Sequence, residues 1–370
     1  MTLARPLIAL SLVGLAACGR TAPAVDPLTL VPADTRLLAA IDVARVRTSP
    51  LHARLLALRD RSDYLRWRWE DLARSAGVDL ARDLDHVVLA APVEATRPDD
   101  LGVLLVGRFD ERRVIDWYKG RIRKDLGEPR ESSYGGRVVV HDQEERELLA
   151  FVSPRVLVGG SKRWVHGVLD VAAGKGPAVR TRPEMNGLLL RVPAAALAWA
   201  VVSLPPAAAG ADGLATKVSG GVAAVDGGSG VRATVQLDTA GAPVATELAE
   251  LLTRGLTQLR QSPLAGRLGV GTLLEQTAVA TESNTCHLRV ALTLEQLDAT
   301  VRAVERGLRE LQRSPLVPAG RGGAADQAAL LELLKGPGGA GGRDGRPAPA
   351  SAEAPPAPGA PARSAGAPAR

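Results

Sequence analysis

The pattern of apolar and polar positions predicts strands and helices along most of the chain. Short apolar or alternating runs predict strands at residues 37–43, 86–91, 101–109, 136–141, 148–152 and 155–159. Apolar residues at helical spacing, with capping residues before them, predict helices at residues 50–59, 62–76, 111–126 and 162–173. This order predicts an α+β fold, with predominantly antiparallel sheets covered by helices on one face.

The second part of the chain repeats this pattern after an apolar segment at residues 188–204. A glycine-rich turn at 226–230 predicts a hairpin between 221–225 and 231–238. A strand pair around 275–280 and 286–293 is expected between two helices, at 244–261 and 295–313. In the latter helix, apolar residues recur every three or four positions from Leu294 to Leu311, which predicts one stripe packed on a sheet.

Small residues divide this body into two parts. We expect a first α+β domain at 28–204, a linker or long loop at 205–217, and a second α+β domain or half at 218–318. The phrase Arg47–Leu55 matches Arg260–Leu268 at six of nine positions. The two copies are predicted to precede different elements, so duplication of the halves stays an open question.

The carboxyl-terminal residues 319–370 predict a mostly disordered tail. From Gly336 to Arg370, 27 of 35 residues are Gly, Pro or Ala, which leaves almost nothing bulky to bury. The apolar segment Asp326–Leu334 is long enough for one or two helical turns, which would either dock on the body or a partner, or fray.

The amino terminus has the three parts of a secretory signal. Arg5 precedes an apolar run from Leu7 to Leu15, which is too short to cross a bilayer, and Ala16 and Ala17 follow it. The motif Leu15-Ala16-Ala17-Cys18 resembles the lipobox of bacterial lipoproteins. The resemblance implies a signal peptide at 1–17, lipid attachment at Cys18, and a lipidated tether at 18–27.

This resemblance also implies a location in the cell envelope. Gly19 after the cysteine is similar to lipoproteins that are sent to the outer membrane in bacteria with two membranes. Acyl chains gain about 0.8 kcal/mol per buried methylene, so we expect the membrane to be bound through the lipid anchor. Another envelope protein or a surface polymer is the expected further partner.

Composition fits a globular body and argues against nucleic acid as a partner. The chain is 46% hydrophobic and 23% charged, with a net charge of +6. Its basic residues are scattered among acids, and no nucleic-acid-binding motif accompanies them.

After lipidation of Cys18, Cys286 has no partner for an internal disulfide. Alternation of Cys286, Leu288, Val290 and Leu292 predicts a strand that points this thiol into the core.

Motifs for catalysis and cofactors are missing from the sequence. Gly174-Lys175-Gly176 lacks the upstream glycine and the following Ser or Thr of a phosphate loop, and Gly227-Gly228-Ser229-Gly230 lacks the spacing of a nucleophile elbow. His141, Asp142, Glu144 and Glu145 form a local group of possible metal ligands, which we interpret as a solvated loop. We therefore predict no catalytic, cofactor or metal residues.

Two surface features suggest contacts. The predicted helix after Asp110 carries six basic residues, Arg112, Arg113, Lys119, Arg121, Arg123 and Lys124. They would either lie against an anionic membrane or form a solvated face around the apolar stripe of Val114, Tyr118 and Ile122. Tyr64, Trp67 and Trp69 would contact glycan or lipid, or pack in the core.

Two further phrases resemble secreted bacterial proteins with the same opening. These phrases are Val31-Pro32-Ala33-Asp34-Thr35, followed by a strand ending at Asp42 and then Arg47 to Leu51, and Gly107-Arg108-Phe109-Asp110. The resemblance implies a shared fold and no particular activity. We expect a cell-envelope lipoprotein that is a non-enzymatic binding or structural module, with an envelope hydrolase of dispersed active site as the alternative.

Overall fold

The computed structural model describes residues 25–61, 66, 70–91, 101–205 and 217–313. The chain divides into two units, 1–309 and 310–370, and the described residues lie almost entirely in the first. The predicted signal peptide, Cys18, most of the 205–217 linker, the tail from residue 319 and the aromatic residues Tyr64, Trp67 and Trp69 lie outside the described residues.

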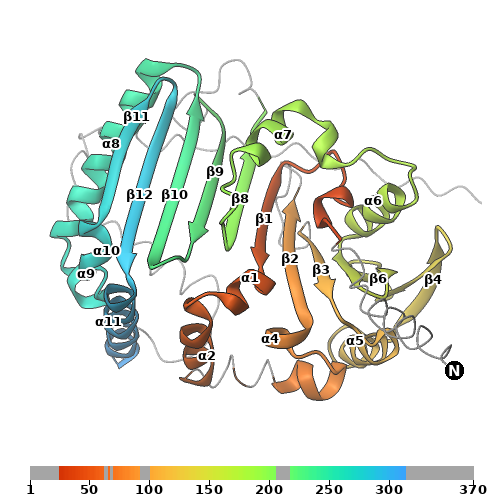
Figure 1. Ribbon diagram of the computed structural model, residues 1–370. Coiled ribbons are helices and arrows are strands. Elements are labelled where there is room, and N and C mark those ends of the chain that lie inside the picture. The colour runs from red at the N-terminus through yellow and green to blue at the C-terminus, as the bar shows by residue number, and fades with distance from the viewer. Residues whose placement is uncertain (1–24, 62–65, 67–69, 92–100, 206–216, 314–370) are drawn as a thin grey trace, which may run out of the picture. The chain divides into compact units, whose positions relative to one another are not determined.

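The strands form one 12-stranded antiparallel sheet (Figure 1). Its strand order is β11-β12-β10-β9-β8-β1-β2-β3-β7-β6-β5-β4. The strands are β1 (Leu37–Asp42), β2 (Leu84–Ala91), β3 (Gly102–Gly107), β4 (Arg130–Tyr134), β5 (Arg137–His141), β6 (Leu148–Ser153), β7 (Val156–Gly160), β8 (Ala198–Ser203), β9 (Val218–Asp226), β10 (Gly230–Thr239), β11 (Thr277–Glu282) and β12 (Thr285–Thr293). The predicted α+β class is confirmed.

Helices and helical turns connect these strands. They are η1 (Pro27–Thr29), α1 (Val43–Thr48), α2 (Leu51–Arg61), η2 (Leu72–Ala76), α4 (Leu80–Asp83), α5 (Glu111–Asp125), α6 (Lys162–Ala172), η4 (Val179–Thr181), α7 (Pro183–Leu190), α8 (Ala242–Gln261), α9 (Pro263–Leu268), α10 (Gly271–Glu275) and α11 (Leu294–Arg313). Asp110 caps α5 as predicted, because its carboxylate accepts a hydrogen bond of 3.1 Å from the N–H of Arg113.

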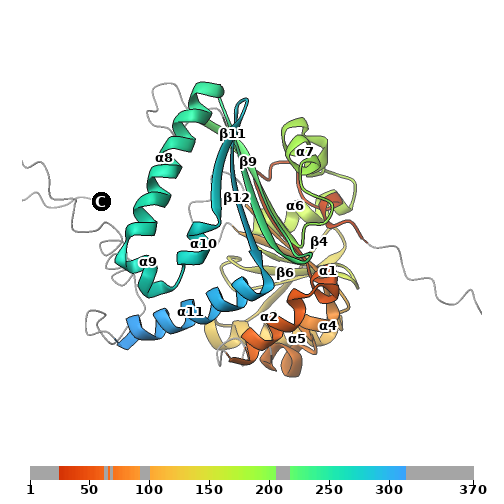
Figure 2. The ribbon, with the colours of Figure 1, turned by 60° about the vertical axis from the view of Figure 1, so that its left-hand side comes forward.

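Helices cover both faces of the sheet, so the prediction of helices on one face is wrong. On one face, α6 and α7 bury Val165, Val168 and Met185 in a core that includes Leu38, Val88 and Leu104 of the sheet. On the other face, α5 buries its stripe of Val114, Tyr118 and Ile122 against β5, β6 and β7. Figure 2 shows α8 and α7 on opposite sides of the strands. Both faces need cover because consecutive residues of β6 and β7, whose side chains point alternately to the two faces of the sheet, are buried.

The sheet contains a topological repeat centred on the neighbouring strands β1 and β8, and β5 and β4 extend one side beyond the repeat. Counting outward from this antiparallel pair, β1-β2-β3-β7-β6 on one side matches β8-β9-β10-β12-β11 on the other. The helix after the third strand is α5 in one half and α8 in the other, and the closing helices are α6 and α11. Strands from both predicted α+β ranges therefore share one sheet, and the second repeat begins at β8, before the 205–217 segment.

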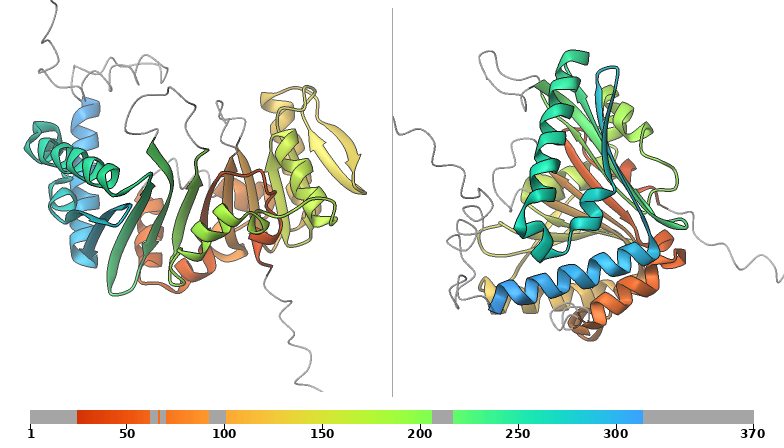
Figure 3. Two further views of the ribbon diagram at one scale, coloured as in Figure 1. Left: turned by 90° about the horizontal axis from the view of Figure 1, so that it is seen from above. Right: turned by 90° about the vertical axis from the view of Figure 1, so that its left-hand side faces the viewer.

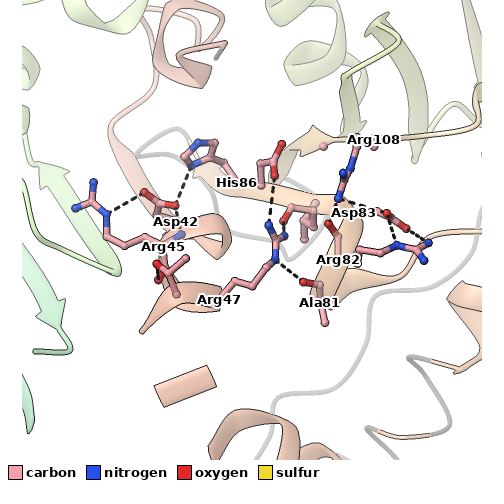
Figure 4. A network of polar contacts seen from close by, with 12 residues as sticks. Asp42, Arg45, Arg47, Ala81, Arg82, Asp83, His86 and Arg108 are labelled. Atoms are coloured by element: carbon pink, nitrogen blue, oxygen red, sulfur yellow. Dashed lines mark hydrogen bonds and ion pairs between the residues drawn. The ribbon is translucent and has the colours of Figure 1, made fainter. Parts of the chain in front are cut away.

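The repeated phrase forms the same local structure in two places. Ser49 and Ser262 each end a helix just before a proline that leads into the next helix, α2 or α9. Arg47 donates hydrogen bonds of 2.6 Å to the carbonyl oxygens of Ala81 and Leu84 (Figure 4). Arg260 likewise donates to Leu274 and Thr277, at 2.7 and 3.0 Å.

In both copies, the arginine binds the first residue of a strand and the residue three positions before it. It thus supplies donors to carbonyl oxygens that the end of a short helix leaves unpaired. The phrases lie between β1 and β2 in one case and between β10 and β11 in the other, which are not equivalent places in the repeat. The two copies of the phrase are therefore a shared local motif and do not mark equivalent positions in the two halves of the sheet.

Several elements were not predicted, among them the strands β4 and β8 and the short helices α1, α4, α7, α9 and α10. β4 is an exposed edge strand of sequence Arg-Glu-Ser-Ser-Tyr, and its polar residues give no strand signal. The apolar segment at 188–204 contains the end of α7 and all of β8, which are separated around Pro193. Apolar residues alone do not distinguish a buried helix end from a strand.

Candidate functional site

The central strands present an uncovered apolar surface on the face of the sheet that α5 and α8 share. We call this surface the open face. It consists of two rows of cross-strand partners: Leu89, Ala39, Ala200, Ala223 and Val235 in one, and Val87, Ile41, Ala198, Val225 and Ala233 in the other. These residues line a hollow of about 310 Å³.

Alanines make the floor of this hollow low. In the first row, Ala39, Ala200 and Ala223 stand between Leu89 and Val235, which belong to strands roughly 19 Å apart if neighbouring strands are spaced at about 4.8 Å. Alanine is depleted in strands because it contributes little side-chain packing there. Three alanines in one row across neighbouring strands therefore leave room for a ligand above the sheet.

The open face exposes large apolar side chains to solvent. Leu37, Ile41 and Leu89 are 40%, 44% and 45% exposed, while Leu38 and Val88 on the opposite face are fully buried. Within the described parts of the chain, no helix covers these central strands on this side. A contiguous exposed apolar surface of this kind marks an interaction site.

A second cavity of about 490 Å³ adjoins the open face beneath α5. Val103 and Leu105 line it, and they are the cross-strand partners of Leu89 and Val87 on the same face. Its polar edge is formed by Tyr118, Arg121, Arg146 and Glu147. The apolar surface therefore continues from the open face into this cavity.

Tyr118 is held at the edge of this cavity. Its hydroxyl donates a hydrogen bond of 3.1 Å to the carbonyl oxygen of Glu147. Burial, followed by the nearby Glu147 carboxylate, raises the pKa of Tyr118 far above its ordinary value, so the phenol stays protonated.

A third hollow of about 250 Å³ lies between α2 and α11, at the β10 end of the open face. Figure 3 shows these two helices side by side in its right panel, and Arg54 and Asp298 join them with an ion pair of 2.9 Å. Val231 lines this hollow and lies two residues before Ala233 on the same face of β10. The three hollows thus follow one face of the molecule.

The predicted solvated loop at His141 and Asp142 is wrong, because both side chains are buried, at 5% and 1% exposure. Asp142 accepts hydrogen bonds from the N–H groups of Arg146 (2.8 Å) and Glu147 (3.3 Å), and from the Arg146 side chain (3.3 Å). Burial opposes ionisation of Asp142, but these donors hold its pKa below the ordinary value. The carboxylate organises the turn between β5 and β6.

Glu144 and Glu145 point to other partners. Glu144 pairs with Arg146 at 3.2 Å, and Glu145 pairs with Lys162 of α6. Among the described residues, no group of three or more His, Cys, Asp or Glu side chains has a geometry that would hold a metal ion.

The fold assembles a polar cluster on α6 that the sequence did not indicate. The rings of Tyr134 and His166 stack with centroids 3.7 Å apart, and the Tyr134 hydroxyl donates to Asp170 at 2.8 Å. Burial and then the Lys162 charge lower the pKa of His166. His166 and Asp170 are four residues apart on one helix, but Tyr134 comes from the edge strand that was not predicted.

The basic residues of α5 are largely paired in the folded chain. Arg121 lies 3.7 Å from Glu147, and Lys119 pairs with Glu131 of β4. Arg112 and Arg123 each lie 4.0 Å from an acid, Asp116 and Glu128. This pairing reduces the excess positive charge on which the membrane interpretation depends. The alternative interpretation places an apolar stripe beneath a charged face, and that stripe is buried as expected.

Cys286 is buried as predicted. It is fully inaccessible on β12 and opposite Leu237 of β10, and burial raises the pKa of its thiol.

Residues of the phrases that resemble secreted bacterial proteins have structural roles in the core and at helix ends. Val31 is fully buried, and Asp110 caps α5. Asp42 caps α1 and lies 3.9 Å from His86 (Figure 4).

Comparison with known proteins identifies no family. The sequence matches no protein-family profile and no curated protein. One solved structure, described as crystal form I of TP0453, matches with a TM-score of 0.41 and 11% identity, over 76% of this chain and 98% of that chain. A likeness at this level assigns no function. Among the residues that the structure describes, no helix combines the length and apolar character needed to cross a membrane.

Proposed function

We propose that this chain is a lipid-anchored cell-envelope protein whose body binds an apolar ligand, without catalysis, on the open face. The observation that carries the proposal is the pair of cross-strand rows between β2 and β10, which contain no polar side chain. Apolar strand surfaces are normally covered by another layer of the protein. A ligand that covers these strands would supply that layer.

The dimensions and lining also favour a binding role. Ligand pockets typically enclose about 300–1,000 Å³ and are mainly hydrophobic with a few polar groups at the edge. The hollows of about 310 and 490 Å³ have this character. Their described lining contains no serine, cysteine or histidine, and its one carboxylate, Glu147, lies 3.7 Å from Arg121. This lining therefore favours the binding role over the alternative of a hydrolase.

Binding can be tested with an apolar fluorescent probe whose emission rises when it leaves water. We expect the full mature chain, carrying Cys18→Ala so that it is free of acyl chains, to bind the probe. Leu89→Glu places a charge beside the alanine floor and should weaken binding at least about tenfold. Leu190→Glu is the matched control, because Leu190 is 74% exposed on α7, away from the open face. Equal binding by both variants would contradict the proposal.

The anchor is tested separately by fractionation of cells. The wild-type chain should sediment with the envelope membranes, in the outer membrane if the bacterium has two, and the Cys18→Ala form should not. Metabolic labelling with a palmitate analogue should mark only the wild-type chain. If both forms fractionate and label alike, the lipid-anchor part of the proposal is wrong, whatever the result for the open face.

A further inference from the structure

We infer that the ligand of the open face is an anionic amphiphile, with its acyl chain over the alanine floor and its phosphate or carboxylate between α2 and α11. This inference rests on the proposed function and adds the ligand's charge and orientation. It depends on an apolar path that leads from the open face to a group of arginines.

The path runs along β10. Ala233 lines the open face, and Val231, two residues earlier on the same side of the strand, lines the hollow between α2 and α11. The hollow continues with apolar side chains of both helices, which are Leu51, Leu55, Leu58, Leu297 and Val301. Leu55 is 46% exposed, as are the large side chains of the open face. An acyl chain would therefore meet apolar surface along the whole path.

The end of the path is positively charged. Arg54, Arg61 and Arg302 line the hollow, and Asp298 is the one acid among its described lining residues. Arg54 pairs with Asp298 at 2.9 Å, and Arg61 lies 3.7 Å from Glu305. Arg302 is exposed and forms no ion pair within the described residues. With both acids counted, one positive charge remains, and arginine is well suited to phosphate and carboxylate groups.

The cavity beneath α5 does not offer this charge. Arg121 and Arg146 lie at its edge, but Arg121 faces Glu147, and Arg146 faces both Asp142 and Glu144. Three carboxylates around two guanidinium groups leave no excess positive charge there. The cavity suits a chain end and not an anionic headgroup, which sets the ligand's direction along the face.

The test compares charged and uncharged amphiphiles with the same chain. We would measure binding of hexadecanoate and hexadecanol to the full mature chain carrying Cys18→Ala, and of vesicles of phosphatidylglycerol and phosphatidylcholine. A preference for hexadecanoate over hexadecanol indicates a carboxylate ligand. A preference for phosphatidylglycerol over phosphatidylcholine, whose phosphate is neutralised by its choline, indicates a lipid with an anionic phosphate headgroup. Either preference should be roughly tenfold, as expected for one charge-assisted hydrogen-bonded pair.

Variants on α11 show whether this preference arises at the proposed place. Arg302→Gln should remove the preference for the charged amphiphile, while Arg306→Gln, which changes an exposed arginine of the same helix outside the hollow, should leave it unchanged. Equal binding of charged and uncharged amphiphiles overturns the inference, and so does an equal effect of the two variants. If Leu89→Glu still abolishes binding in that case, the proposed function stands without the charge assignment.

Other occupants of the face would give a distinct result. A photo-crosslinker placed at residue 89 should label bound amphiphile. If it instead labels residues 319–370 of the same chain, or a second copy, and none of the amphiphiles binds, the open face is covered by protein and the inference is overturned.

Discussion

Replacement of Asp142 by alanine should destabilise the fold by about 3 kcal/mol. The buried carboxylate accepts two backbone hydrogen bonds, from Arg146 at 2.8 Å and Glu147 at 3.3 Å. Hydrogen bonds to a charged group each contribute about 1.5–3 kcal/mol, and alanine would leave both N–H groups without an acceptor. The ion pair to the Arg146 side chain adds less than about 1 kcal/mol, because that side chain is 53% exposed.

Urea denaturation followed by circular dichroism measures this loss. Asp142→Asn keeps a neutral acceptor oxygen and should lose about half as much. Because the pKa of Asp142 is lowered in the folded chain, its stabilisation is complete above the unfolded value of about 3.9 and is lost as the pH falls through the folded value. The difference between wild type and Asp142→Ala should therefore be constant from about pH 7 to pH 5 and should shrink below about pH 4.

Two results would refute this reasoning. The first is an Asp142→Ala protein within about 0.5 kcal/mol of wild type at pH 7, which would mean that the carboxylate does not organise the turn. The second is stabilisation of the wild type, but not of Asp142→Ala, by added Zn²⁺. That result would make the carboxylate a metal ligand.

Three further predictions concern packing. Gly120→Ala should stabilise the chain by up to about 1 kcal/mol, because an added Cβ in mid-helix meets nothing within 4 Å. Gly107→Ala should destabilise the chain by several times that amount, because its Cβ would lie 2.3 Å from a carbonyl oxygen of α4. Thermal unfolding measures both effects, and equal unfolding midpoints would contradict this prediction. Arg47→Ala should lower the free energy of unfolding in urea by about 1–3 kcal/mol, because it removes the hydrogen bonds to two carbonyl oxygens. The control Arg112→Ala changes a side chain that is 92% exposed and should alter this free energy by less than about 0.5 kcal/mol. Similar losses in both variants would exclude a stabilising role for the carbonyl contacts. Cys286 should react with a thiol reagent only as the chain unfolds, because its thiol is buried and its pKa is raised, and rapid reaction in native buffer would show the burial to be wrong.

Local signals in the sequence predicted most elements well. The turn at 226–230 predicted the hairpin of β9 and β10, and Asp110 with the stripe from Val114 to Ile122 predicted α5. Each signal acts within a few residues, through turn geometry, capping or helical periodicity. β4 was missed because an exposed edge strand needs no apolar residues.

The candidate site depends on contacts that local signals do not contain. In runs such as Leu37–Ile41 and Val222–Val225, every residue is apolar, so the side chains on both faces of the strand are apolar. Such a run predicts burial on both faces of a strand. One face of these strands is open, and only the placement of α5 and α8 at its two ends reveals this. The alanines were the available signal, but their alignment in one row requires the pairing of β1 with β8, far apart in the sequence.

The pairing of β1 with β8 also affects the order in which the strands of the sheet can be completed. A chain that emerges amino end first makes β1 early, and β2 can pair with one of its edges soon afterwards. The other edge must wait for residues 198–203, and the intervening chain includes all the strands from β2 to β7. During that interval β1 presents unpaired backbone groups and an apolar surface, the combination that promotes misassembly between nascent chains. Closure of the middle of the sheet, late and over a long loop, is therefore the step at which a folding helper would matter most.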